Sequence, residues 1–339
     1  MSRRRKRAAA AAAVRTGLAP AASRPTVPTV ETLIPRIRGW LTAPQPIERL
    51  ALLRIFLPLA ILGFLSSRLV HADYWLTAVG FQIPDLGGDW RQPLYLPPAP
   101  VWAAWTLAAV ITTSGLCLAA GLASQPAAAI FALGVAYVTL ADRLEAFTVT
   151  KLAPILILAL FFAPCGARYG VDGWWRRRRN PGAKIPTHVA GGTIRFFQIF
   201  LVTMYSASGI AKARGDWLTK QVLWTHLHDQ YQTRVAWLIT HLLPGWMWWA
   251  LQGLVLTFEA GAPIWFALPW TRRPALVVGL GMHAMIGLMF GPVVWFALLM
   301  ATILLASFLP EPLLLRLWAP LRRWSRPTGP AGVAEERSS

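Results

Sequence analysis

Cysteine is nearly absent from this chain, since its 339 residues include only Cys117 and Cys165. Two cysteines cannot form a disulfide framework, and the sequence has no CxxC pair and no Cys/His ligand spacing. It also lacks a glycine-rich nucleotide-binding motif and the signatures of metalloproteases and serine hydrolases. We therefore predict no metal site and no thiol redox chemistry.

Charge is also scarce, because charged residues make up 14% of the chain and hydrophobic residues 55%. Soluble domains carry about 25% charged residues, so the composition predicts a multi-pass membrane protein. A net charge of +19 would favour nucleic acid binding in a soluble protein. Here the Lys and Arg residues lie mostly outside the apolar runs, which is typical of a membrane-topology signal. We expect a lipid bilayer as a partner and no nucleic acid.

The apolar runs approach the roughly 20-residue length needed to span a membrane. They predict an all-α, polytopic transmembrane helical bundle with about eight spans. The expected spans are 49–67, 101–121, 125–141, 147–164, 193–212, 244–268, 274–290 and 292–309.

Three parts of the chain are expected: a basic, disordered cytoplasmic tail over 1–47, a transmembrane domain over 48–310, and a short cytoplasmic tail over 311–339. Eight spans would place both tails and the basic segments 165–195 and 269–273 on one side of the membrane. The positive-inside rule then makes both termini cytoplasmic, in the plasma (inner) membrane.

The opposite side of the membrane would hold two long loops: 71–100, which is rich in Trp, Tyr, Pro and Gly, and 213–243, which carries aromatic residues and three His. Aromatic side chains at a membrane edge usually anchor the protein at the interface. The alternative is that the two loops form a lid over an outward-facing pocket.

The most polar of the expected spans lies in RFFQIFLVTMYSASGIAKARGDW, residues 195–217. Helical spacing places Tyr205, Ser208, Gly209 and Lys212 on one face. The small pair Ser208 and Gly209 would let a ligand approach the backbone, or would allow tight packing against another helix. Both interpretations of this pair stay open from sequence.

Lys212 has three possible environments. It snorkels to the outer surface, pairs with Asp216 four residues later, or points into a dry pocket as a general base. Glu259 and His283 are polar groups within the next two expected spans. A carboxyl at that depth is protonated or hydrogen-bonded, and a lone His usually packs, but together they suggest a shared site. The predicted catalytic residues are Lys212, His283 and Glu259, and the predicted cofactor-binding residues are Tyr205, Ser208 and Gly209.

Three other cationic residues, Arg54, Lys151 and Arg195, lie nearer to the ends of their expected spans. Long cationic side chains in such places usually extend along the apolar surface to reach the interface. We therefore expect these three residues to snorkel and do not assign them to the site.

Several runs resemble the HTTM membrane-domain family, whose members include vitamin K-dependent gamma-carboxylase. They are QIFLVTMYSASGIAKARGDWL, TFEAGAP and MHAMIGLMFGPVVWFALLMATILL, and the resemblance extends over about residues 48–310. In the carboxylase, the lysine that matches Lys212 is the proposed base that deprotonates vitamin K hydroquinone, and His283 matches a histidine of a late span. The resemblance thus implies a reduced, vitamin K-like quinone as cofactor and a carboxylase-like or quinone-dependent lyase or oxidoreductase reaction.

The chain also departs from the carboxylase. Counting back without gaps from the shared VDG at 171–173, the carboxylase's Asn-Asn-His motif falls on Phe147, Thr148 and Val149. Its large lumenal region, which follows the membrane domain, is matched here only by residues 311–339. The sequence therefore leaves open whether the chain is an enzyme.

Two functions of different classes follow. The first is an integral membrane protein resembling the carboxylase, which binds a quinone-like or lipid-like ligand with Lys212 as general base. The second is a non-enzymatic membrane protein for the maturation, export or binding of a secreted peptide. A small-molecule transporter is a third interpretation, although no internal repeat supports it.

Overall fold

The computed structural model describes residues 30–80, 96–141, 148–182, 184–228 and 233–324. The chain divides into two compact units, Met1–Thr42 and Ala43–Ser339. In the first unit, residues Val30–Thr42 form helix α2. Part of the tail that we expected to be disordered is therefore helical.

The second unit is built from helices. Its longer helices are α3 (Ile47–Leu69), α5 (Val101–Ala120), α6 (Ser124–Ala141), α7 (Thr148–Phe161), α9 (Gly192–Arg214), α12 (Gly245–Ala260), α14 (Arg272–Met289) and α15 (Val294–Phe308). Its shorter elements are α4 (Ala72–Trp75), α8 (Val171–Arg179), η2 (Asp216–Leu218), α10 (Val222–His228), α11 (Arg234–Leu242), α13 (Ala262–Ala267), η3 (Gly291–Val293), α16 (Glu311–Leu317) and α17 (Ala319–Trp324). Of the described residues, 79% are helical, which confirms the all-α class.

The protein is an integral membrane protein. Among the described residues, five helical segments are long and apolar enough to cross a membrane: α3, α5, α6, α9 and the continuous segment Gly291–Phe308. Helix α7 is a shorter apolar helix. The expected span 244–268 consists of two helices, α12 and α13, which meet at Gly261. The count of eight spans and the cytoplasmic termini stay predictions.

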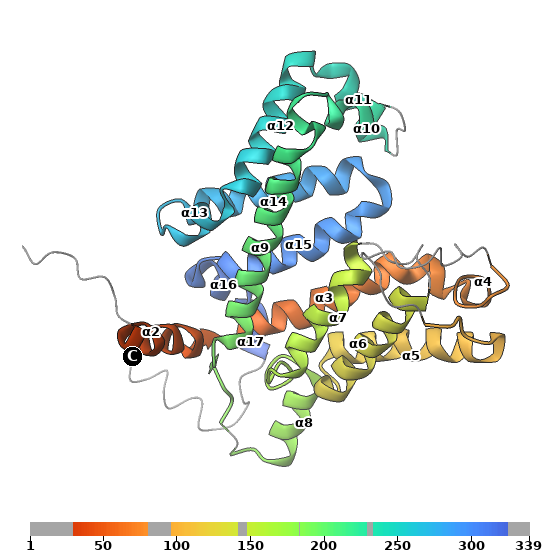
Figure 1. The fold of residues 1–339 in the computed structure, drawn as a ribbon. Helices are drawn as coiled ribbons and strands as arrows, with labels where there is room; N and C mark the ends of the chain where they lie inside the picture. The colour runs from red at the N-terminus through yellow and green to blue at the C-terminus, as the bar shows by residue number, and fades with distance from the viewer. Residues whose placement is uncertain (1–29, 81–95, 142–147, 183, 229–232, 325–339) are drawn as a thin grey trace, which may run out of the picture. The chain divides into compact units, whose positions relative to one another are not determined.

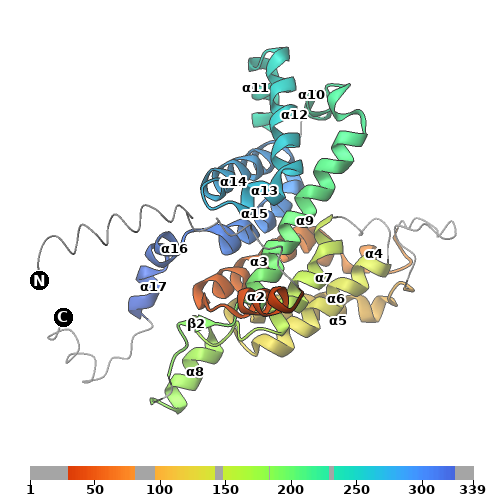
Figure 2. The same ribbon diagram turned by 60° about the vertical axis from the view of Figure 1, so that its left-hand side comes forward.

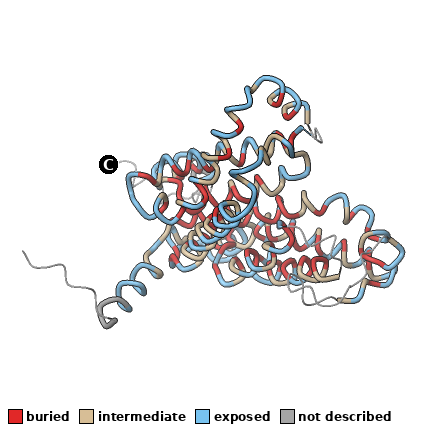
Figure 3. Tube along the Cα trace, turned by 45° about the horizontal axis from the view of Figure 1, so that its top comes forward, coloured by how far each residue is buried: buried red, intermediate tan, exposed pale blue. Residues whose placement is uncertain are grey.

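Helix α3 supplies much of the core. Its residues Leu50, Leu53, Leu57 and Ile61 recur at helical spacing and are at most 1% exposed. The buried side chains of α3 face α5, α7 and α15. Other apolar side chains, such as Leu133 on α6, are exposed on the outside of the helices. Figure 3 shows buried and exposed residues alternating along the helices. Outward apolar side chains are expected where lipid replaces water as the solvent.

The longer helices form two groups. Helices α3, α5, α6 and α7 pack together, and α9 packs with α12 and α13. Helix α15 touches α3, α9 and α14, and therefore joins the two groups (Figure 1). The polar residues selected from sequence lie in the group that contains α9, α12 and α14.

Short contacts bring several helix ends together at what we call the basic end, which contains the start of α3, the start of α9, the end of α15 and α8. Strands β1 (Gln45–Pro46) and β2 (His188–Val189) pair antiparallel between α3 and α9. Arg49 donates hydrogen bonds to the carbonyls of Ala306, at 2.6 Å, and Leu309, at 2.8 Å. Figure 2 shows β2 beside the start of α3 and α8 at the same end.

Arg54 does not snorkel, so that expectation was wrong. It is 1% exposed, and its Nη2 donates to the Tyr169 carbonyl at 2.7 Å. Gly121 and Gly170 make room for it, because a Cβ built on Gly121 would lie 1.4 Å from Arg54 Nη1. Gly121 also has φ 72°, which side-chain-bearing residues rarely adopt. Lys151, in contrast, is exposed.

Two other expected segments, the loop 71–100 and the tail 311–339, are described only in part. Of the loop expected over 71–100, residues 81–95 lie outside the described residues. The segment 311–324 of the expected short tail contains α16 and α17, and its Leu314 and Trp318 are buried.

Candidate functional site

Tyr205 and His283 form a buried hydrogen-bonded pair between α9 and α14. The Tyr205 hydroxyl lies 2.8 Å from His283 Nε2, and the residues are 3% and 2% exposed. The other ring nitrogen of His283, Nδ1, has no hydrogen-bond partner among the described residues. The pair thus joins a phenol and an imidazole through one hydrogen bond between two helices.

Lys212 joins α9 to α12. Its Nζ donates to Glu259 Oε2 at 2.5 Å and to Ser208 Oγ at 2.7 Å. The Lys212 and Glu259 side chains are 22% and 9% exposed, so the ion pair is largely enclosed. Asp216, the partner considered from sequence, instead pairs with Lys220 at the surface. The partner of Lys212 is therefore on another helix.

Gly209 lies where α9 and α12 cross. A Cβ at this position would be 2.4 Å from the Ala260 backbone nitrogen and 2.7 Å from its Cα. The glycine therefore serves tight helix packing, one of the two interpretations of this position. This close approach also brings Lys212 within reach of Glu259.

Aromatic rings surround Tyr205. Its ring centroid lies 5.2 Å from that of Phe258 and 6.4 Å from that of Phe266. Phe258 also lines an apolar groove of about 290 Å³ formed by α12, α13 and α14. One side chain therefore contacts both the groove and the Tyr205–His283 pair.

Gln252 on α12 is a site residue that sequence reasoning missed. It is fully buried, and its Nε2 donates to the carbonyls of Trp217, at 2.5 Å, and Lys220, at 3.1 Å. Its Oε1 accepts from the Leu223 backbone nitrogen at 3.0 Å. These bonds fasten the chain after α9 to α12, and the Trp217 ring lies 5.2 Å from Lys212 Nζ.

A signal for Gln252 is present in the sequence. It is the lone amide in the apolar run WMWWALQGLVL, and it precedes Glu259 by seven residues on the same helical face. A buried amide in an apolar span must find hydrogen-bond partners. Counting polar residues on the Glu259 face would have found it.

The six residues predicted for the site all lie where α9, α12 and α14 meet, and we call Tyr205, Ser208, Gly209, Lys212, Glu259 and His283 the polar cluster. Their assignment as catalytic or cofactor-binding residues stays a prediction. Phe147 lies outside the described residues, Thr148 is exposed, and Val149 is buried in the apolar core. Over the described part of the chain, His, Cys, Asp and Glu form no group of three or more that would hold a metal ion.

Comparison with known proteins gives one match. The model of the HTTM domain matches residues 43–309. This match confirms the resemblance seen over residues 48–310. The chain matches no curated protein and no solved structure.

Proposed function

Because this chain belongs to the HTTM domain family, we propose that it binds a reduced quinone or a similar apolar hydroxyl compound and removes a proton from it. The Lys212–Glu259 ion pair is the observation that carries the proposal, since it is enclosed between two apolar helices and stays partly open at Lys212. Ionisable groups at membrane depth are costly and usually functional.

Lys212 and Glu259 would act as one base. As an ion pair they carry no net charge, and Lys212 has a free lone pair only when its extra proton has moved to Glu259. The 2.5 Å contact between Nζ and Oε2 lets that proton pass directly from one group to the other. After accepting a proton from the ligand hydroxyl, the pair holds one positive charge next to the negative charge left on the ligand. That balance stabilises the step most strongly where water is excluded.

The neighbouring groups would hold the ligand. Ser208 accepts a hydrogen bond from Lys212 and fixes the direction of its amine. Tyr205 and His283 provide a second polar position on the same side of α9, suited to another ligand oxygen. The proposal thus assigns the base role to the Lys212–Glu259 pair and an orienting role to the Tyr205–His283 pair.

An apolar groove next to the polar cluster supports the choice of an apolar ligand; Phe258 lines it and packs against Tyr205, whereas the polar cluster itself is not part of its lining. The groove beside Phe258 measures about 290 Å³, near the lower limit of about 300–1,000 Å³ for small-molecule sites. Its lining is almost entirely apolar, as suits a ligand that arrives from the bilayer. A reduced quinone would supply the acidic hydroxyl and the reducing electrons for a carboxylase-like or quinone-dependent reaction.

Oxygen uptake with vitamin K hydroquinone tests the proposal. The purified protein in lipid nanodiscs should consume oxygen, and Lys212→Ala should lower the rate at least about 100-fold, because it removes the base. Lys212→Arg should lower it as strongly, since Arg does not release its proton. Lys220→Ala, which removes an exposed lysine from an equally short ion pair, should leave the rate unchanged.

A normal rate in Lys212→Arg would contradict the role of Lys212 as a base. Binding of the hydroquinone, measured by quenching of tryptophan fluorescence, separates loss of the ligand from loss of the chemical step. Circular dichroism of each variant verifies that the helices persist.

A second candidate function is binding of a secreted peptide. It is favoured by exposed apolar side chains from α11 to the start of α12: Trp237 is 50% exposed, Leu242 67% and Trp246 69%. Apolar patches often mark interaction sites. Peptide binding would survive Lys212→Arg, whereas the proton-transfer function would not, so the same variant distinguishes the two functions.

A further inference from the structure

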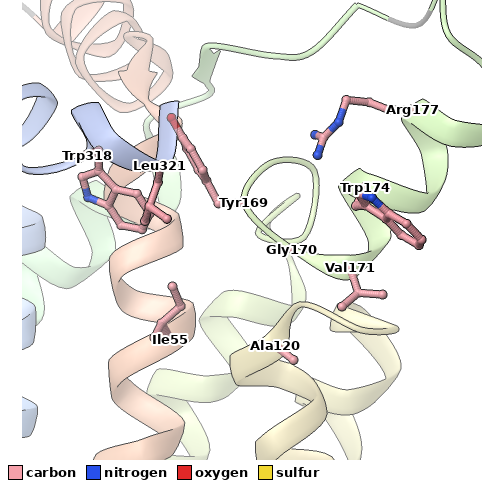
Figure 4. A pocket seen from close by; sticks show the side chains of 9 residues that line it. All are labelled: Ile55, Ala120, Tyr169, Gly170, Val171, Trp174, Arg177, Trp318 and Leu321. Carbon is pink, nitrogen blue, oxygen red and sulfur yellow. The ribbon is translucent and has the colours of Figure 1, made fainter. Parts of the chain in front are cut away.

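A second cavity lies at the basic end, apart from the polar cluster. Its volume is about 540 Å³, within the range of about 300–1,000 Å³ seen for small-molecule sites. Its lining comes from α3, the end of α5, the loop before α8, α8 itself and the segment containing α16 and α17 (Figure 4). The cavity is therefore formed only when distant parts of the second unit have packed.

The lining is mainly apolar and aromatic. Ile55 comes from α3, and the rings of Tyr169 and Trp318 pack with centroids 4.8 Å apart. Trp174 on α8 also lines the cavity and is 42% exposed. Tyr and Trp are enriched where membrane meets water. The aromatic lining at the ends of spanning helices indicates that the cavity lies at the level of the lipid headgroups.

Arg177 places positive charge in this apolar cavity. Figure 4 shows its side chain reaching back from α8 toward the loop at Gly170. Its Nη1 is buried and has no hydrogen-bond partner among the described residues. The pKa of Arg177 is lowered from its ordinary value, first by burial and then by the positive charge of Arg168. An anion beside Arg177 would offset both effects.

The other arginines of α8 differ from Arg177. Arg178 stacks over Trp174 at 5.2 Å, and Arg179 stacks over Trp175 at 4.8 Å. Arg176 is exposed and does not line the cavity. Of the four consecutive arginines of α8, Arg177 is thus the one that lines this cavity.

A second cation lies beneath the cavity wall. The guanidinium of Arg54 packs against Gly121 and Gly170, and Gly170 lines the cavity. Its Nε and Nη1 are buried and lack a hydrogen-bond partner within the described residues. The nearby acid Asp172 is engaged with the start of α6, since it accepts from the Ala123 and Ser124 backbone nitrogens. Asp172 still offsets part of the charge of Arg54, and Glu48 lies 3.8 Å from Arg168. With Arg177, three arginines face two acids, and a net positive charge remains at this site.

We propose that this cavity binds one anionic membrane lipid, with an acyl chain against Ile55 and Trp318 and the phosphate at Arg177. Guanidinium and phosphate form strong, charge-assisted hydrogen bonds. The apolar lining favours a lipid over a free anion, and the buried, unpartnered nitrogen favours an anionic lipid over a neutral one. This inference does not depend on the proposed proton-transfer function.

Lipid binding by the full-length protein tests the proposal. Detergent-solubilised protein is titrated with phosphatidylglycerol or phosphatidylcholine, and bound lipid is counted by native mass spectrometry. Phosphatidylglycerol should bind at least about tenfold more tightly, because one charge-assisted hydrogen bond supports a difference of that order. Arg177→Gln should abolish this preference, and Arg177→Lys should retain part of it.

Arg176→Gln is the matched control, because it removes the same charge one residue away and should keep the preference. Equal losses in Arg176→Gln and Arg177→Gln would overturn the proposal in favour of diffuse surface charge. Ala120→Phe narrows the cavity without touching Arg177, and should weaken binding of the lipid but not of glycerol phosphate. If glycerol phosphate competes as well as the whole lipid, the proposed contact of an acyl chain with Ile55 and Trp318 is wrong. Circular dichroism of all variants excludes unfolding as the cause.

Discussion

The basic end and the polar cluster both bury charge, but their charged groups have different partners. At the basic end, Arg49, Arg54 and Asp172 bind mainly backbone groups, and the ion pair between Arg168 and Glu48 is long, at 3.8 Å. In the polar cluster, Lys212 binds Glu259, a side chain of another helix. Charges that bind backbone groups hold helix ends in place, whereas a pair of side chains can also gain or lose a proton. The first region therefore belongs to the framework, and the second is suited to chemistry.

The largest expected effect concerns Asp172, which connects α8 to α6. It accepts hydrogen bonds from the Ala123 nitrogen, the Ser124 nitrogen and the Ser124 hydroxyl. Asp172→Ala should lower the free energy of unfolding by about 4 kcal/mol, since bonds to a charged group contribute about 1.5–3 kcal/mol each. Denaturant titration in micelles, followed by circular dichroism, measures it.

Asp216→Ala is the control for this prediction, because Asp216 is exposed and its ion pair with Lys220 lies at the surface. It should change the free energy of unfolding by at most about 0.5 kcal/mol. Similar losses in the two variants would mean that Asp172 does not hold the basic end together.

An intermediate effect is expected for Gln252, which lies on the same face of α12 as Glu259 but binds backbone groups. Gln252→Ala should lower the free energy of unfolding by about 2 kcal/mol, because it removes three hydrogen bonds to part-buried backbone groups of residues 217–223. Hydrogen exchange of residues 217–223 should rise. Gln125→Ala, at an exposed glutamine, should change neither quantity. Unchanged hydrogen exchange in Gln252→Ala would show that Gln252 does not position Trp217.

The smallest expected effect is the coupling between Lys212 and Glu259. A double-mutant cycle with Lys212→Met and Glu259→Gln should give about 1 kcal/mol, since polar pairs between membrane helices average about 0.6 and reach about 1.7 kcal/mol. The exposed Lys220 and Asp216, at the same 2.5 Å separation, should give about 0.3 kcal/mol. If the coupling energy of Lys212 with Glu259 is no larger than that of Lys220 with Asp216, enclosure between helices does not strengthen the ion pair.

Much of the fold was predictable because apolar periodicity is a local property. Within the described residues, each expected span is mostly helical, and the face carrying Tyr205, Ser208, Gly209 and Lys212 follows from helical spacing alone. The break at Gly261 and the helices within the expected tails were missed, because they depend on turns and contacts that composition does not reveal.

The six residues of the polar cluster were selected from sequence and lie together, but their contacts were not predicted and their role as a site stays a prediction. The sequence selected Lys212 and Glu259 separately, yet offered Asp216 as the partner of Lys212, because only neighbours along one helix can be counted from sequence. Gln252 was missed since its partners lie in the segment after α9. Arg54 was expected at the interface because it lies near the end of its span. That expectation was wrong, since the space that buries Arg54 is made by two glycines of other segments, Gly121 and Gly170.

The sequence by itself determined that this is a helical membrane protein of the HTTM domain family and which face of α9 is polar. Only the tertiary structure decided that Lys212 pairs with Glu259, that Tyr205 pairs with His283, and that Arg177 is the one of the four arginines of α8 that lines the cavity at the basic end. Helical spacing and apolar length act within one segment. Ion pairs and cavities depend on the distance between segments, which is set when the helices pack.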